Sequence, residues 1–535
     1  MAGAQEGVMT TSDERRAPWL TTALLLLAVA LIGFAHAAVL PPWEGFDETA
    51  HWSYIQELAD TGHAPRYGAD GISRDVDAYR GPMTYSGAEP FDRTGHLTFR
   101  RYRQGGAAPI PGGPTRYASD DGPNWQAQHP PLYYALMAPL YRLAHGLGWV
   151  DHLLALRLAS WALAFAGFAL GVAATARAAI RPGAARAGIG PWTAPIMAAW
   201  PFLFPQFFPQ FARLGNDSLC LLLVGATWAL LLRLLQGDGR WATAAALGVV
   251  LGLGLLTKAF FLPIGVSVGL ILLLRGRTGD RRQDRLAEAA LAGVLALAIG
   301  GGWYLQKALQ TGSITGADEF IKLKQAGGMG ALADGFSVTE LARGLWLMLA
   351  TFVWAGTWSL AALPEGLMAP PLALLALVAV GYGLSLRGRG PERAPLLAWT
   401  PLILAAPMAA GLVYHVFVWM AGTSAFTPGW YFHILAAPLG YGVARGWRRP
   451  RLLAALTGLT ALSTAVAWAA QLSMFSGCAA KLGRDPHYSL AGAACLIDPL
   501  ALVRLGHPLL GTVALALGAA CAAAAAGVAA RAYRF

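Results

Sequence analysis

The chain has 535 residues, of which 56% are hydrophobic and only 13% are charged, with a mean hydropathy of +0.47. Soluble domains carry about 25% charged residues, so this composition excludes an ordinary soluble protein. The formal net charge of +11 does not indicate nucleic-acid binding, because the arginines lie in short segments between apolar runs, where the positive-inside rule places them. The sequence therefore predicts an all-α polytopic membrane protein with no nucleic-acid partner.

Apolar runs long enough to cross a bilayer recur along the chain and predict about 12 transmembrane helices. The first run lacks a clean small-residue cleavage site and is followed by many others, so we expect it to remain as a span rather than to be cleaved as a signal peptide. The predicted spans are 19–40, 152–178, 191–208, 218–235, 241–257, 260–275, 287–306, 366–386, 396–418, 431–445, 451–472 and 507–530.

The connectors between these spans predict the orientation of the chain. Arginines collect in alternate connectors and in the tail, and all of these segments are cytoplasmic if both termini are cytoplasmic. The long loop 41–130 then lies outside. Two further apolar stretches, 131–148 and 341–361, begin and end on the outside, so we expect interfacial or re-entrant helices there.

The predicted helices divide the chain into two modules. An amino-terminal transmembrane module, 1–306, carries the external loop 41–150 with its interfacial helices and the candidate catalytic residues. A carboxy-terminal transmembrane module, 307–535, carries the external loops 307–361 and 473–506.

The four cysteines fall into two groups. Cys220 and Cys521 lie within predicted spans and are expected to be inert. Cys478 and Cys495 both lie in the external loop 473–506, where an oxidising compartment favours a disulfide between them. Two free thiols remain the alternative.

A group of ionisable residues follows immediately after the first span. Asp47 is predicted to begin a helix, with its side chain capping the amides ahead of Glu48, and His51 lies one helical turn further on. The alternative is that Asp47 is only an N-cap and Glu48 only a favourable charge at a helix N-terminus. An apolar stripe on this helix is expected to lie on lipid: Trp52, Ile55 and Ala59.

Other polar residues are predicted on the same side of the membrane. Ionisable residues at membrane depth are costly and usually functional. The alternative for Asp217 is an N-cap, and for Lys258 and Arg157 it is snorkelling to the lipid headgroups. The full set comprises His129, Arg157, Arg213, Asp217, Lys258, Tyr431 and His433.

The order of these motifs resembles that of a known superfamily. An Asp-Glu pair follows the first span, PPLYY follows the long loop, and Asn-Asp, Thr-Lys and Tyr-Phe-His occur at later span ends. This order is similar to that of the GT-C superfamily of polyprenyl-phosphate-sugar glycosyltransferases, such as the lipid A aminoarabinose transferases and the protein O-mannosyltransferases. The resemblance implies a GT-C fold and a glycosyltransferase of the bacterial inner membrane, with its active site on the periplasmic face.

The resemblance also implies roles for the residues. Asp47 resembles the catalytic base, which would deprotonate an acceptor hydroxyl while a polyprenyl phosphate leaves with inversion, and Glu48 would assist it. His129 stands where the aminoarabinose transferases carry lysine. The donor phosphate would be bound by Lys258, Arg213, His129 and Arg157, and the acceptor by His51, Asp217, Tyr431 and His433.

Several alternatives remain open at this stage. A divalent cation could be held by Asp47, His51 and Asp217, although no cofactor is required by the motifs. A lipid or glycan transporter would predict midplane charges and inverted repeats, which the sequence does not show. A non-catalytic protein with the same fold is a third interpretation. The sequence does not specify the sugar, nor whether the acceptor is a lipid, a polysaccharide or a protein.

Overall fold

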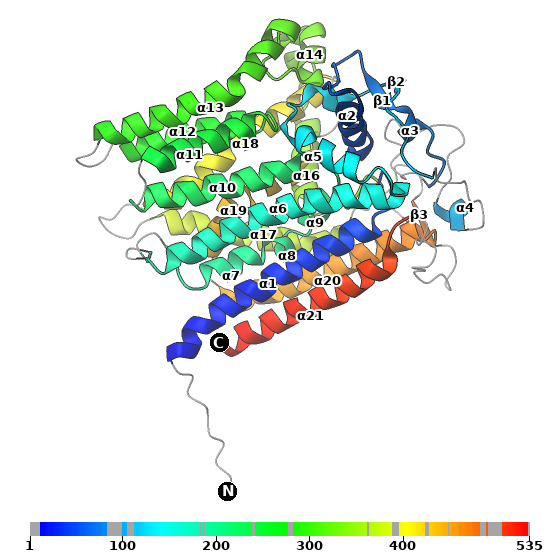
Figure 1. The fold of residues 1–535 in the computed structure, drawn as a ribbon. Helices are drawn as coiled ribbons and strands as arrows, with labels where there is room; N and C mark the ends of the chain where they lie inside the picture. The colour runs from blue at the N-terminus through cyan, green and yellow to red at the C-terminus, as the bar shows by residue number, and fades with distance from the viewer. Residues whose placement is uncertain are drawn as a thin grey trace.

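We describe the protein from a computed structural model. The structure describes residues 11–82, 99–103, 112–181, 184–185, 188–237, 241–276, 282–360, 363–387, 395–422, 427–447, 449–481, 488–490 and 505–532. Long helices dominate these residues and run roughly alongside one another, with shorter elements gathered at one end of the bundle (Figure 1).

Within the described ranges, eight helices are long and apolar enough to cross a membrane, which confirms the predicted all-α multi-pass architecture. Each of them overlaps one of the predicted spans. They are α1 (Thr11–Val39), α6 (Trp149–Ala179), α10 (Asp217–Leu235), α13 (Arg282–Thr311), α17 (Glu365–Leu386), α18 (Leu396–Met420), α20 (Pro450–Phe475) and α21 (Pro508–Ala532). The proposed module boundary after residue 306 falls inside α13, and the division into two modules stays a prediction.

The other four predicted spans take shorter forms. Two are apolar helices of 15 and 16 residues, α11 (Trp241–Leu255) and α12 (Phe261–Gly276). The run 191–208 is broken into α7 (Thr193–Ala198), α8 (Trp200–Leu203) and α9 (Phe207–Phe211), because its repeated prolines remove backbone donors and clash with the preceding turn. The run 431–445 is a 3₁₀ segment, η2 (Gly429–Leu435), followed by α19 (Ala436–Gly446).

The short elements at the end of the bundle come mainly from the predicted external segments. Figure 1 shows most of them at the end away from the carboxy terminus. The antiparallel pair β1–β2 aligns Gly71 with Pro123, and β3 pairs with β4 in the same sense. These elements are α2 (Glu48–Thr61), β1 (Gly71–Ser73), α3 (Arg74–Asp77), α4 (Phe99–Arg103), β2 (Ser119–Pro123), η1 (Trp125–Gln128), α5 (Leu132–Leu143), α14 (Asp318–Gln325), α15 (Met329–Asp334), α16 (Val338–Val353), β3 (Ala479–Lys481) and β4 (Tyr488–Leu490).

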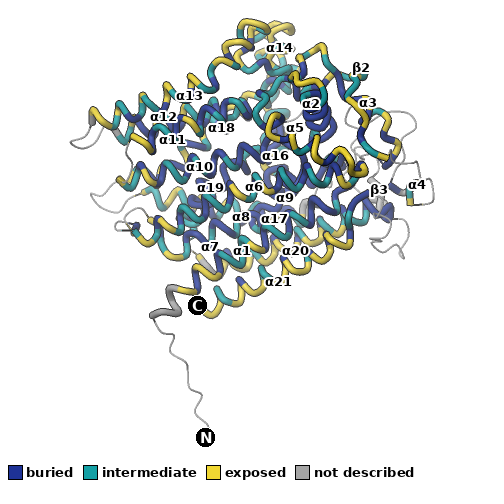
Figure 2. Tube along the Cα trace, viewed as in Figure 1, coloured by how far each residue is buried: buried dark blue, intermediate teal, exposed yellow. Residues whose placement is uncertain are grey.

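The apolar stripe of α2 lies inside the protein, so the prediction that it faces lipid was wrong. Trp52 and Ile55 have no exposed surface, and Ala59 has 6%. The Trp52 ring stacks on Trp149 with centroids 4.6 Å apart and meets the Tyr141 ring edge-on at 5.3 Å. Helices α5 and α6 therefore cover the face that the sequence assigned to lipid, and α2 is buried among the short elements at this end of the bundle (Figure 2).

The first and last described helices, α1 and α21, lie antiparallel and side by side (Figure 1). Two glycines of α21 make the close approach possible. A Cβ atom at Gly511 would lie 2.4 Å from Val39 Cγ1, and one at Gly518 would lie 2.7 Å from Ile32 Cγ1. Small residues at such a seam allow two membrane helices to pack backbone to backbone.

The cysteines are only partly covered by the described residues. Cys220 and Cys521 are free thiols within α10 and α21, in agreement with their predicted positions in spans. Cys478 lies buried just after α20. Its predicted partner, Cys495, lies outside the described residues, so the bridge between them stays a prediction.

Candidate active site

The turn between α1 and α2 has an unusual backbone at two positions. Trp43 and Asp47 have φ angles of 67° and 57°, in the left-handed region that side chains other than glycine rarely adopt. Asp47 occupies the N-cap position of α2, and its carbonyl accepts the backbone N–H of His51 at 2.9 Å, but its side chain makes no capping bond. Asp47 therefore begins the helix as predicted, but the prediction that its side chain caps the helix was wrong, and its carboxylate is left for another use.

Asp47 is the one residue between positions 40 and 57 that is not buried. Its Oδ1 accepts a hydrogen bond of 3.1 Å from the indole N–H of Trp125. Burial of the carboxylate raises the pKa of Asp47, while Arg213, the Trp125 hydrogen bond and Lys258 act in the opposite direction. The result is a partly exposed residue whose carboxylate has a pKa shifted toward that of an effective base.

Glu48, the next residue, is held in a fully paired environment. Its carboxylate receives two bonds from Arg157, Nε to Oε1 at 2.7 Å and Nη2 to Oε2 at 2.5 Å, and a third from the backbone N–H of Leu214 at 3.1 Å. Arg157 also donates to the carbonyls of Leu40 and Pro41. Both charged side chains are almost completely buried, so Arg157 does not snorkel, and the pair ties α6 to the turn.

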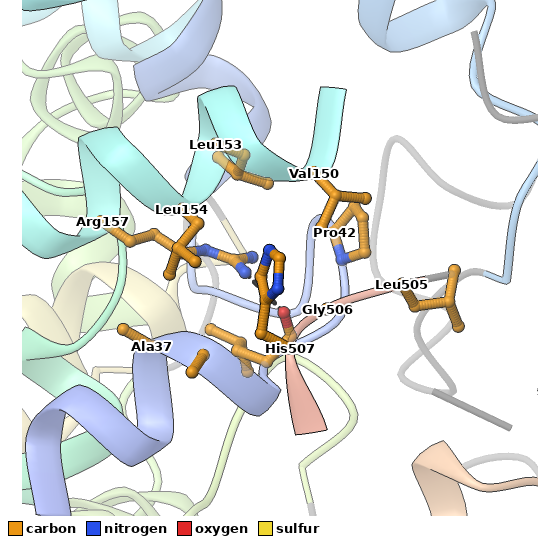
Figure 3. A pocket seen from close by; sticks show the side chains of 11 residues that line it. Ala37, Pro42, Val150, Leu153, Leu154, Arg157, Leu505, Gly506 and His507 are labelled. Atoms are coloured by element: carbon orange, nitrogen blue, oxygen red, sulfur yellow. Dashed lines mark hydrogen bonds between the residues drawn. The ribbon is translucent and has the colours of Figure 1, made fainter. Parts of the chain in front are cut away.

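The surroundings of Arg157 are visible in Figure 3. The side chain leaves α6 beside Leu153 and Leu154, and its guanidinium points toward the turn near Pro42. A shallow recess on this side is lined mainly by apolar residues, with His507 at its edge. With four of its N–H groups already donated, Arg157 is poorly placed to bind the phosphate that the sequence assigned to it.

Asp217 is the hub of a second charged group. Asn216 is the N-cap of α10, so Asp217 is the first helical residue and not the cap. Its Oδ2 accepts Arg213 Nη2 at 2.9 Å and Gln210 Nε2 at 2.8 Å, and its Oδ1 accepts Lys258 Nζ at 2.7 Å. All four side chains of this hub are buried. The alternative of snorkelling for Lys258 is therefore wrong.

Lys258 also faces two aromatic rings. Its Nζ lies 4.6 Å from the ring centroid of Phe260 and 5.0 Å from that of Tyr431. The two rings pack together with centroids 4.9 Å apart. Since its bond to Asp217 uses one of three N–H groups, the ammonium retains, among the described residues, donors for a further anion.

Arg213 connects this hub to the turn that carries Asp47. Its Nη1 donates to the carbonyl of Phe46 at 2.6 Å, one residue before Asp47, while Nη2 binds Asp217. The Nε atom of Arg213 is buried and has no hydrogen-bond partner among the described residues. Arg213 therefore links Asp217 to the turn that carries Asp47, and its Nε–H group remains available as a donor.

His51 is a neutral hydrogen-bonding group in this framework. Its Nδ1 lies 3.0 Å from the hydroxyl oxygen of Tyr134, whose O–H donates to Gln126 Oε1 at 3.3 Å. This arrangement assigns the imidazole proton to Nδ1 and leaves Nε2 as an acceptor. Burial, with the charges of Arg213 and Lys258, lowers the pKa of His51 well below its ordinary value.

The other two predicted histidines differ in their surroundings. Burial and the charge of Lys258 lower the pKa of His129 to about 3, so its ring is neutral and can offer a phosphate a hydrogen bond but no charge. His433 is fully buried, with Nδ1 accepting from Trp200 at 3.1 Å and Nε2 lying 2.9 Å from the carbonyl of Phe352. Both ring nitrogens of His433 are engaged, which leaves none for an acceptor.

The combination suggested for a divalent cation is not assembled. Within the described part of the chain, no three His, Cys, Asp or Glu side chains gather into a metal-binding group. Both carboxylate oxygens of Asp217 already accept N–H donors, two of them from cations. The residues that are present therefore do not fit a metal shared by Asp47, His51 and Asp217.

Sequence reasoning missed several partners in this site. Trp125 begins the short 3₁₀ helix η1, 78 residues from Asp47, and no local sequence pattern predicts their contact. Tyr134 lies in the PPLYY stretch, but its bond to His51 depends on how α5 packs on α2. Glu44 could have been noticed as a charged residue immediately after a membrane span, in the same turn as Asp47.

The chain was compared with known families, curated proteins and solved structures. No known family model matches it, and no curated protein matches it. The structure is similar to ArnT from Cupriavidus metallidurans bound to undecaprenyl phosphate, at 16% identity over 95% of this chain and 71% of that one, with a TM-score of 0.43. The apo form of that ArnT matches at 15% identity over 81% of this chain and 77% of that one, with a TM-score of 0.34.

A third similar structure is the Archaeoglobus fulgidus oligosaccharyltransferase in the apo form. It matches at 14% identity over 94% of this chain and 56% of that one, with a TM-score of 0.36. ArnT and the oligosaccharyltransferase are both GT-C proteins, the superfamily that the motifs of the sequence resemble. Because every TM-score is below 0.5, we base the proposals below on the residues of this chain.

Proposed function

We propose that the chain is an integral-membrane glycosyltransferase that moves a sugar from a polyprenyl-phosphate donor to an acceptor hydroxyl of a lipid, polysaccharide or protein. We place the reaction on the external face of a bacterial inner membrane. The observation that carries the proposal is Asp47. Its backbone is strained, its side chain is not used as a cap, and it is the one residue of its turn that is not buried.

In the proposed reaction, Asp47 acts as the general base. The acceptor oxygen forms a bond to the anomeric carbon while the bond from that carbon to the phosphate oxygen breaks. The electron pair leaves on the phosphate, and the acceptor proton moves to the Asp47 carboxylate. Attack from the side opposite the leaving group inverts the anomeric centre, and such a base contributes about 10²–10⁴-fold to the rate.

We assign the donor phosphate to Lys258, which keeps free N–H donors beside the aromatic rings of Phe260 and Tyr431. The neutral ring of His129 would add a hydrogen bond. A phosphate bound here would offset the positive charges that hold down the pKa of Asp47, and so would make Asp47 a stronger base when the donor is present. Glu48 and Arg157 support the turn and do not contact substrate in this proposal.

The acceptor would approach from the partly exposed side of Asp47. His51 Nε2 is an acceptor that can orient a hydroxyl on its way to Asp47, because its tautomer is fixed by Tyr134 and its ring is neutral. Asp217 would act through Lys258 and Arg213, and Tyr431 through Lys258. His433 has no part in this arrangement.

The test compares purified wild-type protein with Asp47→Asn, because asparagine keeps the shape and tolerates the left-handed backbone but cannot accept the proton. We expect the variant to fold and to bind undecaprenyl phosphate as the wild type does, while transfer from a polyprenyl-phosphate sugar falls about 10²–10⁴-fold. Asp151→Asn, which changes a half-exposed acid paired with His507, is the matched control. Near-normal transfer by Asp47→Asn would rule out the proposed mechanism.

A further inference from the structure

A second acid, Glu44, lies three residues before Asp47 and has no exposed surface. Its Oε2 accepts the hydroxyl of Thr357 at 2.7 Å and the backbone N–H of Ser359 at 3.2 Å, and its Oε1 accepts the hydroxyl of Ser359 at 2.7 Å. These donors lie more than 300 residues away in the chain. Hydrogen bonds to an ionised carboxylate are stronger than neutral ones, so these three bonds join the two distant segments firmly.

The backbone and the neighbouring rings add to this contact. The carbonyl of Glu44 accepts the backbone N–H of Trp358 at 2.9 Å. The Trp358 ring meets Phe46 edge-on at 5.3 Å, and Phe46 stacks on Trp430 at 4.1 Å. The turn that carries Asp47 is therefore joined to segment 354–360 by side-chain bonds, a backbone bond and aromatic packing.

Segment 354–360 is itself held firmly from behind. Gln206 accepts the backbone N–H groups of Ala355 and Gly356 at 2.6 and 2.9 Å and donates to the carbonyl of Gly356. Gln471 donates to the Thr357 hydroxyl at 3.1 Å. Glu44 thus binds a segment that is itself hydrogen-bonded to Gln471 of α20 and to Gln206, just before α9.

The turn that carries Asp47 needs these contacts because its own backbone conformation is unfavourable. Residues in sparsely populated backbone regions cost about 1–3 kcal/mol each and persist only where the surroundings determine them. Trp43 and Asp47 are two such residues, one on each side of Glu44. Gly45 lies so close to Arg213 that a Cβ atom there would approach its Cβ to 2.8 Å.

We propose that Glu44 is a positioning residue for the reaction. Its hydrogen bonds to residues 357–359 hold Asp47 in the left-handed conformation that presents the carboxylate to substrate. This inference rests on the function proposed for Asp47. It makes the catalytic turn dependent on a segment of the later part of the chain, so that neither part forms the site alone.

The charge of Glu44 gives these hydrogen bonds a pH dependence. Burial raises the pKa of Glu44 to about 7, its hydrogen bonds to Ser359 and Thr357 oppose this, and the charge of Glu48 adds to it. Tyr79 also faces Glu44, and it lies near Arg157. A raised pKa means that the folded protein favours the protonated carboxyl, so the fold is not weakened as the pH falls through about 7. Protonation does convert one acceptor oxygen of Glu44 into an O–H group, and it therefore changes the hydrogen bonds to residues 357–359.

The test uses Glu44→Gln, with Glu288→Gln, which changes a buried acid paired with Arg275 outside the site, as the matched control. We expect Glu44→Gln to lower kcat about 10- to 100-fold with little change in KM, since misplacing a reacting group costs rate more than binding. The part of the wild-type pH profile centred near 7 should disappear in this variant. Hydrogen exchange should rise at residues 43–50 and 354–360 and stay unchanged in the control.

A second variant approaches the same contact from the other side. Thr357→Val with Ser359→Ala keeps Glu44 but removes both hydroxyl donors, and it should reproduce the kcat loss and the faster exchange at 43–50. This variant carries the test if Glu44→Gln gives no folded protein. Wild-type kcat and unchanged exchange at 43–50 in the variant that folds would overturn the inference.

Failure of the proposed function would look different. If Asp47→Asn transferred sugar normally, or if the wild type transferred none, the mechanism would fall. The exchange measurements would still show whether Glu44 holds the turn. Normal kcat in Glu44→Gln beside an inactive Asp47→Asn would reject the positioning role alone.

Discussion

Asp47 and Glu48 are adjacent acids in the same turn, yet their environments are opposite. Glu48 has no exposed surface and receives three hydrogen bonds, two of them from Arg157. Asp47 is partly exposed and, among the described residues, its carboxylate accepts a hydrogen bond from the neutral indole of Trp125. The comparison teaches that a buried charge is stabilising only where its partners are complete, and that the incompletely paired acid is the better candidate for the proposed base.

The largest effect should come from breaking the paired side. Arg157→Met would leave Glu48 buried without its cation, and removing one partner of a buried ion pair costs about 3–5 kcal/mol. We expect a large fall in the free energy of unfolding, measured by thermal or denaturant unfolding in detergent, with Arg233→Met, at an exposed site on α10, as the control. Adding Glu48→Met should recover part of the loss. Wild-type stability of Arg157→Met would show that the pair is not structural.

A smaller effect on binding is expected at the reactive side. Lys258→Met removes a charge-assisted contact worth about 1.5–3 kcal/mol, which corresponds to about 10- to 150-fold in Kd for undecaprenyl phosphate. Asp217 keeps Arg213 and Gln210, so the fold should survive. Lys324→Met, at an exposed lysine of α14, is the control. An unchanged Kd would mean that Lys258 does not bind the phosphate, and it would favour the available Nε–H group of Arg213 as the donor instead.

The single bond to Asp47 can be tested through the pH profile. The Trp125 N–H favours the ionised carboxylate, so Trp125→Phe should raise the pKa of Asp47 further. Because the base must be unprotonated, the acid limb of transfer activity should move to higher pH by about one unit, which corresponds to about 1.4 kcal/mol. Trp346→Phe, at an exposed tryptophan of α16, should leave the profile unchanged. A limb that does not move would separate the indole from the reacting carboxylate.

The smallest effect concerns the backbone at Asp47. Asp47→Gly and Asp47→Ala both remove the carboxylate, but only glycine relieves the left-handed conformation, which costs other residues about 1–2 kcal/mol. The glycine variant should therefore unfold at higher temperature than the alanine variant, by an amount that corresponds to about 1 kcal/mol. Equal stabilities would mean that the turn relaxes when the side chain changes.

The sequence was sufficient for the membrane architecture, and it singled out the residues from which the candidate site is built. Apolar run lengths predicted the membrane helices, and the charged residues at their ends predicted where Asp47, Asp217 and Lys258 would be found. These features depend on local composition, which a single chain displays directly. The prolines of run 191–208 also carried the information that this run would not be one helix, although it was counted as a full span.

The sequence was insufficient to predict which partners each charged side chain binds. Arg157 and Lys258 look alike as isolated cations near a membrane surface, but one is committed to Glu48 and to carbonyls while the other retains donors. Arg157 reaches its partners across more than 100 residues of sequence, and Lys258 reaches Asp217 across 41, so neither contact is visible as a local pattern. The left-handed backbone of Asp47 was hidden for the same reason, since distant ties enforce it.

The pairing of α1 with α21 bears on how the protein is made. The glycine seam of α21 fits the surface of α1 near Ile32 and Val39, but α21 is translated after every other described helix. During synthesis the face of α1 near Ile32 and Val39 therefore lacks its α21 contacts while the intervening helices insert. The helix that leads directly into the turn carrying Asp47 therefore reaches its final packing only after α21 has been made.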